Sequence, residues 1–175
     1  MRGEWVKKGE EASPRGRSKF ELGVKAWAGC SWEGKTRIHF IPKSMKGWEY
    51  LDFIKKKAEP DLLRLYPRKE KPPIWLQDGE GFHIAKVVKE YLKKSRIIPI
   101  ADYPSHSPDL NWQENVWEML RQGVRKRRPT TIEGLKKVVK EEWEKIPLSK
   151  IRKCISSMDK RLAAVRAAGG GNSKY

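Results

Sequence analysis

The sequence predicts an α/β fold in which a mixed sheet is flanked by helices. Apolar residues alternate along residues 22–32 and 35–41 around a Glu33-Gly34 break, which is the pattern of an antiparallel hairpin. Two short apolar segments, 74–76 and 96–100, enclose an amphipathic stretch. A strand, a helix and a strand over this distance form a right-handed parallel crossover. At 175 residues, one domain with its own core is expected.

Apolar residues at helical spacing predict the other elements. We expect helices over residues 48–57, 61–66, 84–94 and 114–124, with Pro60 separating the first two. Thr130 or Thr131 should cap a long helix ending at Ile146, followed by a last helix over 149–168. The strand pattern puts His39 opposite Ile38 and Phe40, so we expect a solvent-facing residue there and no ligand.

These elements define three regions. The prediction is a polar N-terminal arm over residues 1–20, one α/β domain over 21–168 and a flexible, glycine-rich tail over 169–175.

The charge balance narrows the class of partner. Lys and Arg number 39 against 22 acidic residues, a formal charge of +17, which favours a polyanion such as nucleic acid over a generically basic protein. No run of 18 apolar residues is present, so no membrane partner is expected. The N-terminus shows no signal peptide. Cys30 and Cys154 lack a pairing pattern and the three histidines lack cysteine neighbours, so zinc is not expected.

Two carboxylates lie at a predicted strand end and a predicted helix start, where side chains can act as metal ligands. The apolar run 74–76 ends at Gln77-Asp78 and breaks at Gly79, which indicates a strand delivering Asp78 to a sheet end. Glu114 falls in the first turn of a predicted helix. A carboxylate at a strand end and one at a helix start can hold a hard divalent cation together. Each also has a plain structural interpretation, as a turn residue and as a partner of the helix dipole.

Two motifs give these carboxylates a family context. Gln77-Asp78 followed by His83, and Ser107-Pro108-Asp109-Leu110-Asn111 followed by Glu114, resemble the second-acid and third-acid motifs of mariner/Tc-type DDE transposases. The acids are 36 positions apart (114 − 78), close to the family's spacing. Segments around Trp27-Ala28-Gly29 and from Ser157 to the end are also similar, so the resemblance covers about residue 5 onward.

The resemblance implies a ribonuclease-H-like fold and DNA strand cleavage and transfer with Mg²⁺ or Mn²⁺ in a two-metal site. It implies that Asp78 bridges both metals and that Glu114 binds one. His83 would support Asp78 or a phosphate, and Asn111 would orient the loop that presents Glu114. A nuclear location and action as a dimer follow from the same resemblance.

The chain also departs from the family pattern. Gly79 stands in place of the usual Asn and Trp112 in place of the usual Pro, which we expect to loosen both loops. No residue matches the family's first catalytic Asp, the central first strand that carries it, or the helix-turn-helix domains before it. We therefore expect two bare sheet edges, covered by residues 1–20 or by a second copy in a homodimer. The alternative is a longer gene product.

Further residues are candidates for DNA contact. The cluster Arg125, Lys126, Arg127 and Arg128 is expected to contact phosphates, the alternative being a solvated face. An exposed Trp112 would stack on an unpaired base, although packing is the simpler interpretation. Three functions stay open: a transposase catalytic domain lacking its first acid, a catalytically inactive DNA-binding remnant that is domesticated or truncated, and, more weakly, a protein-interaction scaffold.

Overall fold

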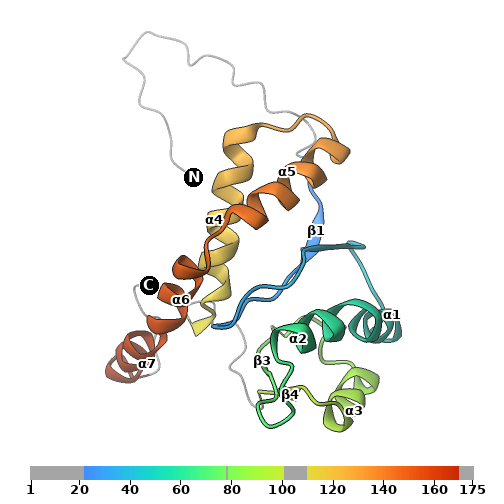
Figure 1. Cartoon of the computed structure of the whole chain (residues 1–175), viewed down its shortest axis with the longest axis vertical. Coiled ribbons are helices and arrows are strands. Elements are labelled where there is room, and N and C mark those ends of the chain that lie inside the picture. The colour runs from blue at the N-terminus through green and yellow to red at the C-terminus, as the bar shows by residue number, and fades with distance from the viewer. Residues whose placement is uncertain (1–21, 78, 101–109, 170–175) are drawn as a thin grey trace.

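The computed structural model describes residues 22–77, 79–100 and 110–169 (Figure 1). The N-terminal half contains β1 (Lys25–Trp27), β2 (His39–Ile41), α1 (Gly47–Phe53), the π-helical turn η1 (Ile54–Ala58), α2 (Glu59–Leu65), β3 (Ile74–Trp75), α3 (Lys86–Lys94) and β4 (Ile98–Pro99). The C-terminal half is helical, with α4 (Gln113–Arg127), α5 (Ile132–Lys145), α6 (Leu148–Ser156) and α7 (Met158–Ala167). None of the described helices is long and apolar enough to cross a membrane.

Both predicted strand pairings are present. β1 pairs antiparallel with β2, with Ala26 opposite Phe40, and β3 pairs parallel with β4, with Ile74 opposite Ile98 across the α3 crossover. Within the described residues the strands form two separate two-stranded sheets, and the single mixed sheet that the sequence predicts is not formed there.

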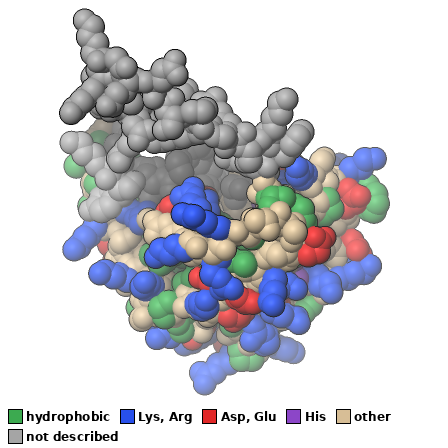
Figure 2. Space-filling view, turned by 90° about the horizontal axis from the view of Figure 1, so that it is seen from above, with side chains coloured by type: hydrophobic (Ala, Val, Ile, Leu, Met, Phe, Trp, Pro, Cys, Tyr) green, Lys and Arg blue, Asp and Glu red, His purple; other side chains and the backbone are tan. Residues whose placement is uncertain are grey.

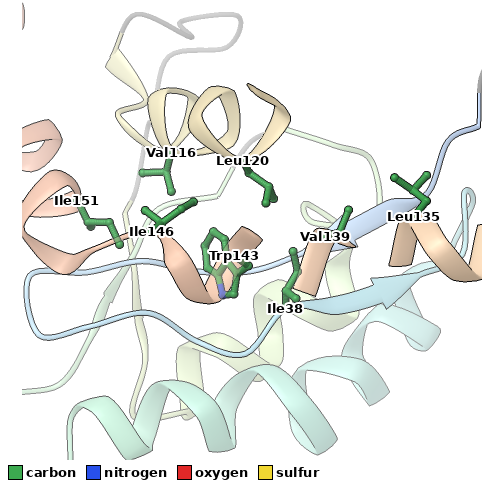
Figure 3. Packing of buried hydrophobic residues seen from close by; sticks show 8 residues of the cluster. All are labelled: Ile38, Val116, Leu120, Leu135, Val139, Trp143, Ile146 and Ile151. Carbon is green, nitrogen blue, oxygen red and sulfur yellow. The ribbon is translucent and has the colours of Figure 1, made fainter. Parts of the chain in front are cut away.

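Two hydrophobic clusters hold the fold together, and the hairpin lies between them. The first joins Ile38 to α4, α5 and α6, with Trp143 fully buried at its centre (Figure 3). The second joins β3, α1 and α3 around Tyr50. Figure 1 shows the hairpin between α4–α7 on one side and α1–α3 on the other. Ala26 packs against the first cluster and Trp27 against the second, so both faces of β1 are covered.

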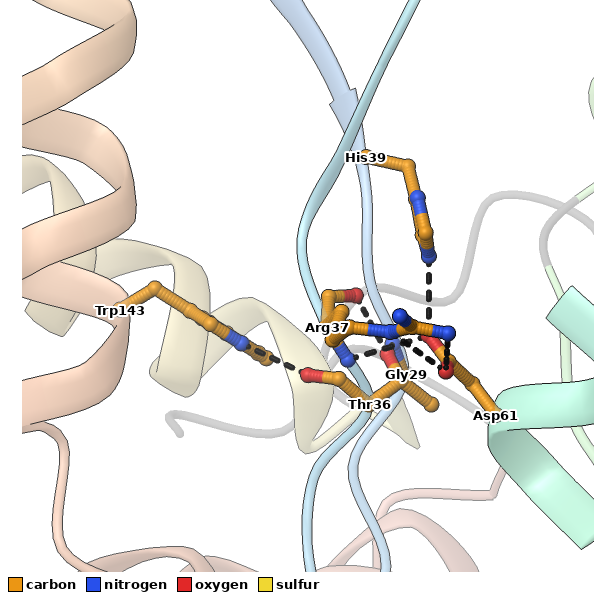
Figure 4. A network of polar contacts seen from close by, with 6 residues as sticks. All are labelled: Gly29, Thr36, Arg37, His39, Asp61 and Trp143. Carbon is orange, nitrogen blue, oxygen red and sulfur yellow. Dashed lines mark hydrogen bonds and ion pairs between the residues drawn. The ribbon is translucent and has the colours of Figure 1, made fainter. Parts of the chain in front are cut away.

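This two-sided packing makes the prediction for His39 wrong. Its side chain is only 16% exposed, and Nε2 lies 2.9 Å from Oδ2 of Asp61 on α2. Arg37 holds the same carboxylate through its backbone N–H at 3.2 Å and its Nε at 2.8 Å (Figure 4). The alternation of apolar residues identified the two faces of the strand correctly, but helix α2 covers the face that was expected to meet solvent.

Two helix boundaries also differ from the prediction. Pro60 does not separate two helices, because the backbone widens into η1 just before it and the Glu59 N–H bonds to the Ile54 carbonyl, five residues back. Pro60 then occupies the first turn of α2, where its missing N–H costs no helical hydrogen bond. The single predicted C-terminal helix divides at Ser157, whose hydroxyl donates to the Cys154 carbonyl at 2.6 Å.

Candidate active site

A cavity of about 390 Å³ lies where the two sheets and α4 meet. Its wall includes residues 25–31 of the hairpin, residues 73–77 at β3 and residues 111–114 at the start of α4. The two predicted motifs, which are distant in sequence, thus contribute to one cavity. Gln77 and His83 come from the second-acid motif, and Asn111 and Glu114 from the third.

Asp78 itself lies outside the described residues, so the position of its carboxylate is not part of this structure. Gln77, the residue before Asp78, is held by hydrogen bonds through both polar atoms of its side chain. Tyr50 Oη donates to Gln77 Oε1 at 3.1 Å, and Gln77 Nε2 donates to the His83 carbonyl at 3.3 Å. The end of the β3 segment is therefore tied to α1 and to the loop that follows it. These two hydrogen bonds hold the segment that leads into Asp78 in place.

His83 is buried among aromatic rings and also lines the cavity. Its ring centroid lies 4.7 Å from that of Tyr50 and 4.4 Å from that of Phe82. This packing fixes the orientation of the imidazole at the cavity wall. The predicted role, supporting Asp78 or a phosphate, remains a prediction.

Glu114 begins α4 with an exposed carboxylate. Its backbone N–H bonds to the Asn111 carbonyl at 3.1 Å, and Asn111 Oδ1 accepts from the Gln113 N–H at 3.1 Å. Asn111 thus satisfies two amide groups that a helix start leaves without partners. Among the described residues, Arg121 is the cation that pairs with Glu114, with Nη2 lying 3.8 Å from Oε2. The carboxylate is accessible, and its backbone is held in place.

Gln113 presents an unused donor to the same region. Its Nε2 is buried and has no hydrogen-bond partner among the described residues. The Gln113 side chain lies beside the Cys30 thiol: burial raises the pKa of that thiol to about 12, and Gln113 acts in the opposite direction. This contact brings the hairpin against the start of α4. A buried, unpartnered amide at a cavity wall is costly unless the cavity takes up an acceptor.

Trp112 packs against the first hydrophobic cluster while lining the cavity, which agrees with the simpler of its two predicted roles. Its carbonyl accepts from the Asn115 N–H at 3.1 Å, so it is part of the helix start. The loosening that we expect from Trp112 stays a prediction. Base stacking by Trp112 is untested.

The basic cluster 125–128 is not one uniform surface. Arg127 bridges α4 to α5 through Glu141 at 3.0 Å and Glu142 at 3.2 Å, and Arg125 lies 3.5 Å from Glu118. Lys126 and Arg128 have no ion pair within the described ranges. Arg128 adopts a left-handed conformation, with φ of 45°, and ends α4. Only part of the cluster is therefore available for phosphates.

Basic side chains extend well beyond this cluster. Figure 2 shows Lys and Arg scattered over the face seen from above, with acidic groups among them. Over the whole chain Lys and Arg outnumber Asp and Glu 39 to 22, and such an excess of cations suits contact with a polyanion.

The donor set suits a hard cation, although the described residues do not make a complete metal site. No three His, Cys, Asp or Glu side chains gather within residues 22–77, 79–100 and 110–169. Glu114 offers oxygen ligands from a helix start, and Gln77 and Asn111 place two more oxygen-bearing side chains around the same cavity. Oxygen ligands of this kind are those that Mg²⁺ and Mn²⁺ accept. Asp78 is the residue that would complete the pair.

Comparison with known proteins agrees with the motifs. Residues 2–146 match the model of the DDE superfamily endonuclease family. The chain is 28% identical to the transposable element Tc3 transposase of Caenorhabditis elegans over 154 residues, covering 87% of this chain and 46% of the relative. It is 33% identical to the Tcb2 transposase of Caenorhabditis briggsae over 152 residues, covering 87% and 54%.

The transposable element Tc1 transposase of Caenorhabditis elegans is 33% identical over 102 residues, covering 58% of this chain and 37% of that protein. The chain therefore spans about half the length of the Tc3 and Tcb2 relatives. The family match covers the hairpin, the crossover and both acid motifs. The chain belongs to the DDE superfamily endonucleases and is a relative of the Tc1/mariner-type transposases.

Proposed function

We propose that this chain is the catalytic domain of a DNA transposase and that it cleaves and transfers DNA strands. The observation that carries the proposal is the meeting of the two acid motifs at one cavity. Gln77, the neighbour of Asp78, and Glu114 both line it, although they lie 37 positions apart (114 − 77) in the sequence.

Each site residue has a distinct part in this proposal. Asp78 and Glu114 would hold Mg²⁺ or Mn²⁺, which supplies activation of a water or 3′-hydroxyl and stabilisation of the leaving oxygen. Asn111, which accepts from the Gln113 N–H and whose carbonyl accepts from the Glu114 N–H, would hold the helix start that presents Glu114. His83 would orient Asp78 or contact a phosphate.

DNA is the proposed partner because the chain carries a formal charge of +17 and because Lys126 and Arg128 have no ion pair among the residues that the structure describes. A nuclear location would follow from that partner. The domain is proposed to extend over residues 21–168.

The cavity also supports a ribonuclease-H-like arrangement. Its wall includes both β1 and β3, and within the described residues each of these strands pairs with one neighbour only. One extended segment inserted there would join the two sheets into the single mixed sheet that the sequence predicts. We propose that residues 1–20 or a second copy of the chain supplies the segment that covers these edges.

Nicking of supercoiled plasmid DNA tests the function. The assay uses this chain with and without Mn²⁺. We expect nicked DNA only with Mn²⁺, and loss of nicking in Asp78→Asn and Glu114→Gln. Glu118→Gln, one turn further along α4, is the matched control and should nick like the unaltered protein, because Glu118 pairs with Arg121 and does not line the cavity.

Two results would contradict catalysis. Nicking that survives both Asp78→Asn and Glu114→Gln would show a different site or a contaminant. Salt-sensitive DNA binding without nicking would favour the DNA-binding remnant over the enzyme.

A further inference from the structure

We propose that the exposed face of the Trp32 ring is a stacking site for an unpaired nucleobase. This inference rests on the proposed function, because it takes DNA as the ligand. Trp32 is 49% exposed, at the turn of the β1–β2 hairpin. An indole left half in solvent offers a π-face that any base can stack on, and such stacking gives affinity without sequence preference.

The turn holds the indole in a fixed position. The Ser31 N–H bonds to the Gly34 carbonyl at 2.7 Å, and the Gly34 N–H bonds to the Ser31 hydroxyl at 3.3 Å. Cys30 and Lys35 form an isolated β-bridge just before the turn. A ring on a closed, hydrogen-bonded turn loses little freedom when a ligand stacks on it.

Arg152 on α6 fixes the ring further. Its Nε donates to the Trp32 carbonyl at 2.9 Å, and its guanidinium carbon lies 5.3 Å from the ring centroid. This is a cation–π contact on one face of the indole. A base on the other face would complete a three-layer stack. The helix that supplies Arg152 also carries Lys150 and Lys153 and has no acidic residue, which suits the phosphates flanking such a base.

The stacking site lies beside the candidate active site. Ser31, the residue before Trp32, lines the cavity, and Cys30 meets the side chain of Gln113, the neighbour of Glu114. Figure 1 shows the hairpin turn next to the first turn of α4 and next to α6. A DNA strand that enters the cavity can therefore place a nearby unpaired base on Trp32. Blunt duplex DNA, whose bases are all stacked internally, has no base to offer.

The chain provides a matched control. Trp48 on α1 is also exposed, at 62%, and within the described residues no cation stacks on its ring. Replacing Trp32 and Trp48 separately removes the same side chain from two surface positions. Only the first position adjoins the cavity.

Fluorescence anisotropy with two labelled DNAs tests the proposal: a blunt duplex, and the same duplex with a short 3′ extension of unpaired thymines. We expect Trp32→Ala to lower affinity for the extended duplex about tenfold and to leave the blunt duplex unchanged. Trp32→Phe should retain most of the affinity, and Trp48→Ala should match the unaltered protein on both DNAs. Thermal unfolding of each variant checks that the fold is kept.

The outcomes separate this inference from the proposed function. If the unaltered protein binds both DNAs and Trp32→Ala binds them equally well, or loses both equally, the stacking site is wrong and DNA binding stands. If the unaltered protein binds neither DNA, the proposed function fails, and the stacking site fails with it. Photocrosslinking of 5-iodouracil in the extension gives a second readout, and a crosslink at Trp48 with none at Trp32 would also overturn the proposal.

Discussion

Arg161 on α7 donates a 2.6 Å hydrogen bond from Nη2 to Oδ1 of Asn115, the residue that follows Glu114. Arg161 is only 5% exposed, and its Nε donates to the Ser157 hydroxyl at 2.9 Å. A buried, charged donor makes a strong hydrogen bond. The C-terminal helix therefore fixes the first turn of α4, and with it the backbone of the candidate third acid.

We expect Arg161→Ala to lower the free energy of unfolding by about 2 kcal/mol, because the bonds of a charged donor are lost from a buried site. Urea denaturation measures the change. Arg166→Ala, on an exposed position of the same helix, is the control and should change stability by less than about 0.5 kcal/mol. Equal effects of the two variants would show that Arg161 does not anchor α4.

Trp143 joins the hairpin to the helices. It is fully buried, stacks on Trp117 at 5.8 Å and donates from Nε1 to the Thr36 carbonyl at 2.9 Å. We expect Trp143→Ala to cost about 4 kcal/mol of stability. Trp143→Phe keeps most of the packing and loses the hydrogen bond, so it should cost about 1–2 kcal/mol. If Trp143→Phe is as unstable as Trp143→Ala, packing of the ring does not contribute more to stability than the hydrogen bond, which would contradict the prediction.

Asp61 should make stability depend on acid pH. Burial opposes ionisation of this carboxyl, but hydrogen bonds and charge from Arg37 and His39 outweigh it, so its pKa falls below the usual 3.8. A depressed folded-state pKa gives stability that is complete above the unfolded value and is lost as pH falls through the folded value.

We expect Asp61→Asn to be less stable than the unaltered protein by about 2 kcal/mol at pH 7. The gap should narrow once pH drops below 3.8. Chemical denaturation at several pH values measures it, and a gap that stays constant down to pH 2 would contradict the ionised carboxylate.

We expect only Lys126 and Arg128 of the basic cluster 125–128 to contact DNA phosphates. Neutralising Lys126 and Arg128 together should weaken DNA binding and reduce the slope of log affinity against log salt by about 2, one for each phosphate contact. The control removes the same charge from α3, through Lys93→Ala with Lys94→Ala, and should leave more of the slope intact. A loss of equal size in both double variants would mean that net charge alone governs binding.

Local patterns in the sequence predicted most elements and missed what depends on tertiary contacts. The alternation of apolar residues predicted the hairpin, and their helical spacing predicted α5. Thr131 was one of two predicted caps for that helix, and its hydroxyl accepts from the Gly134 N–H at 3.0 Å. The same alternation misplaced His39, because nothing in a strand's own pattern reveals that a helix covers its second face. Asp61 was passed over for the same reason, since an acidic residue in a helix gives no sign of its burial.

The sequence likewise predicted some residues of the candidate site and missed others. Motif spacing located Glu114 and Asn111, and the structure places both at the cavity that Gln77 lines. Trp32 gave no signal, because its exposure and its contact with Arg152, 120 positions away, arise only from the fold. For the cluster 125–128, sequence proximity suggested one surface. The ion pairs of Arg127 depend on where α5 lies, which charge patterning does not specify.

Asp78 and Glu114 are proposed to bind the same cation. Mn²⁺ titration of the full chain, followed by the electron paramagnetic resonance signal of free Mn²⁺, tests it without DNA or catalysis. We predict that Asp78→Asn and Glu114→Gln each weaken the tightest Mn²⁺ site at least about tenfold, as expected when one of two carboxylate ligands is removed. Glu118→Gln should leave that site unchanged. Binding as tight as that of the unaltered protein in either single variant would contradict a shared site.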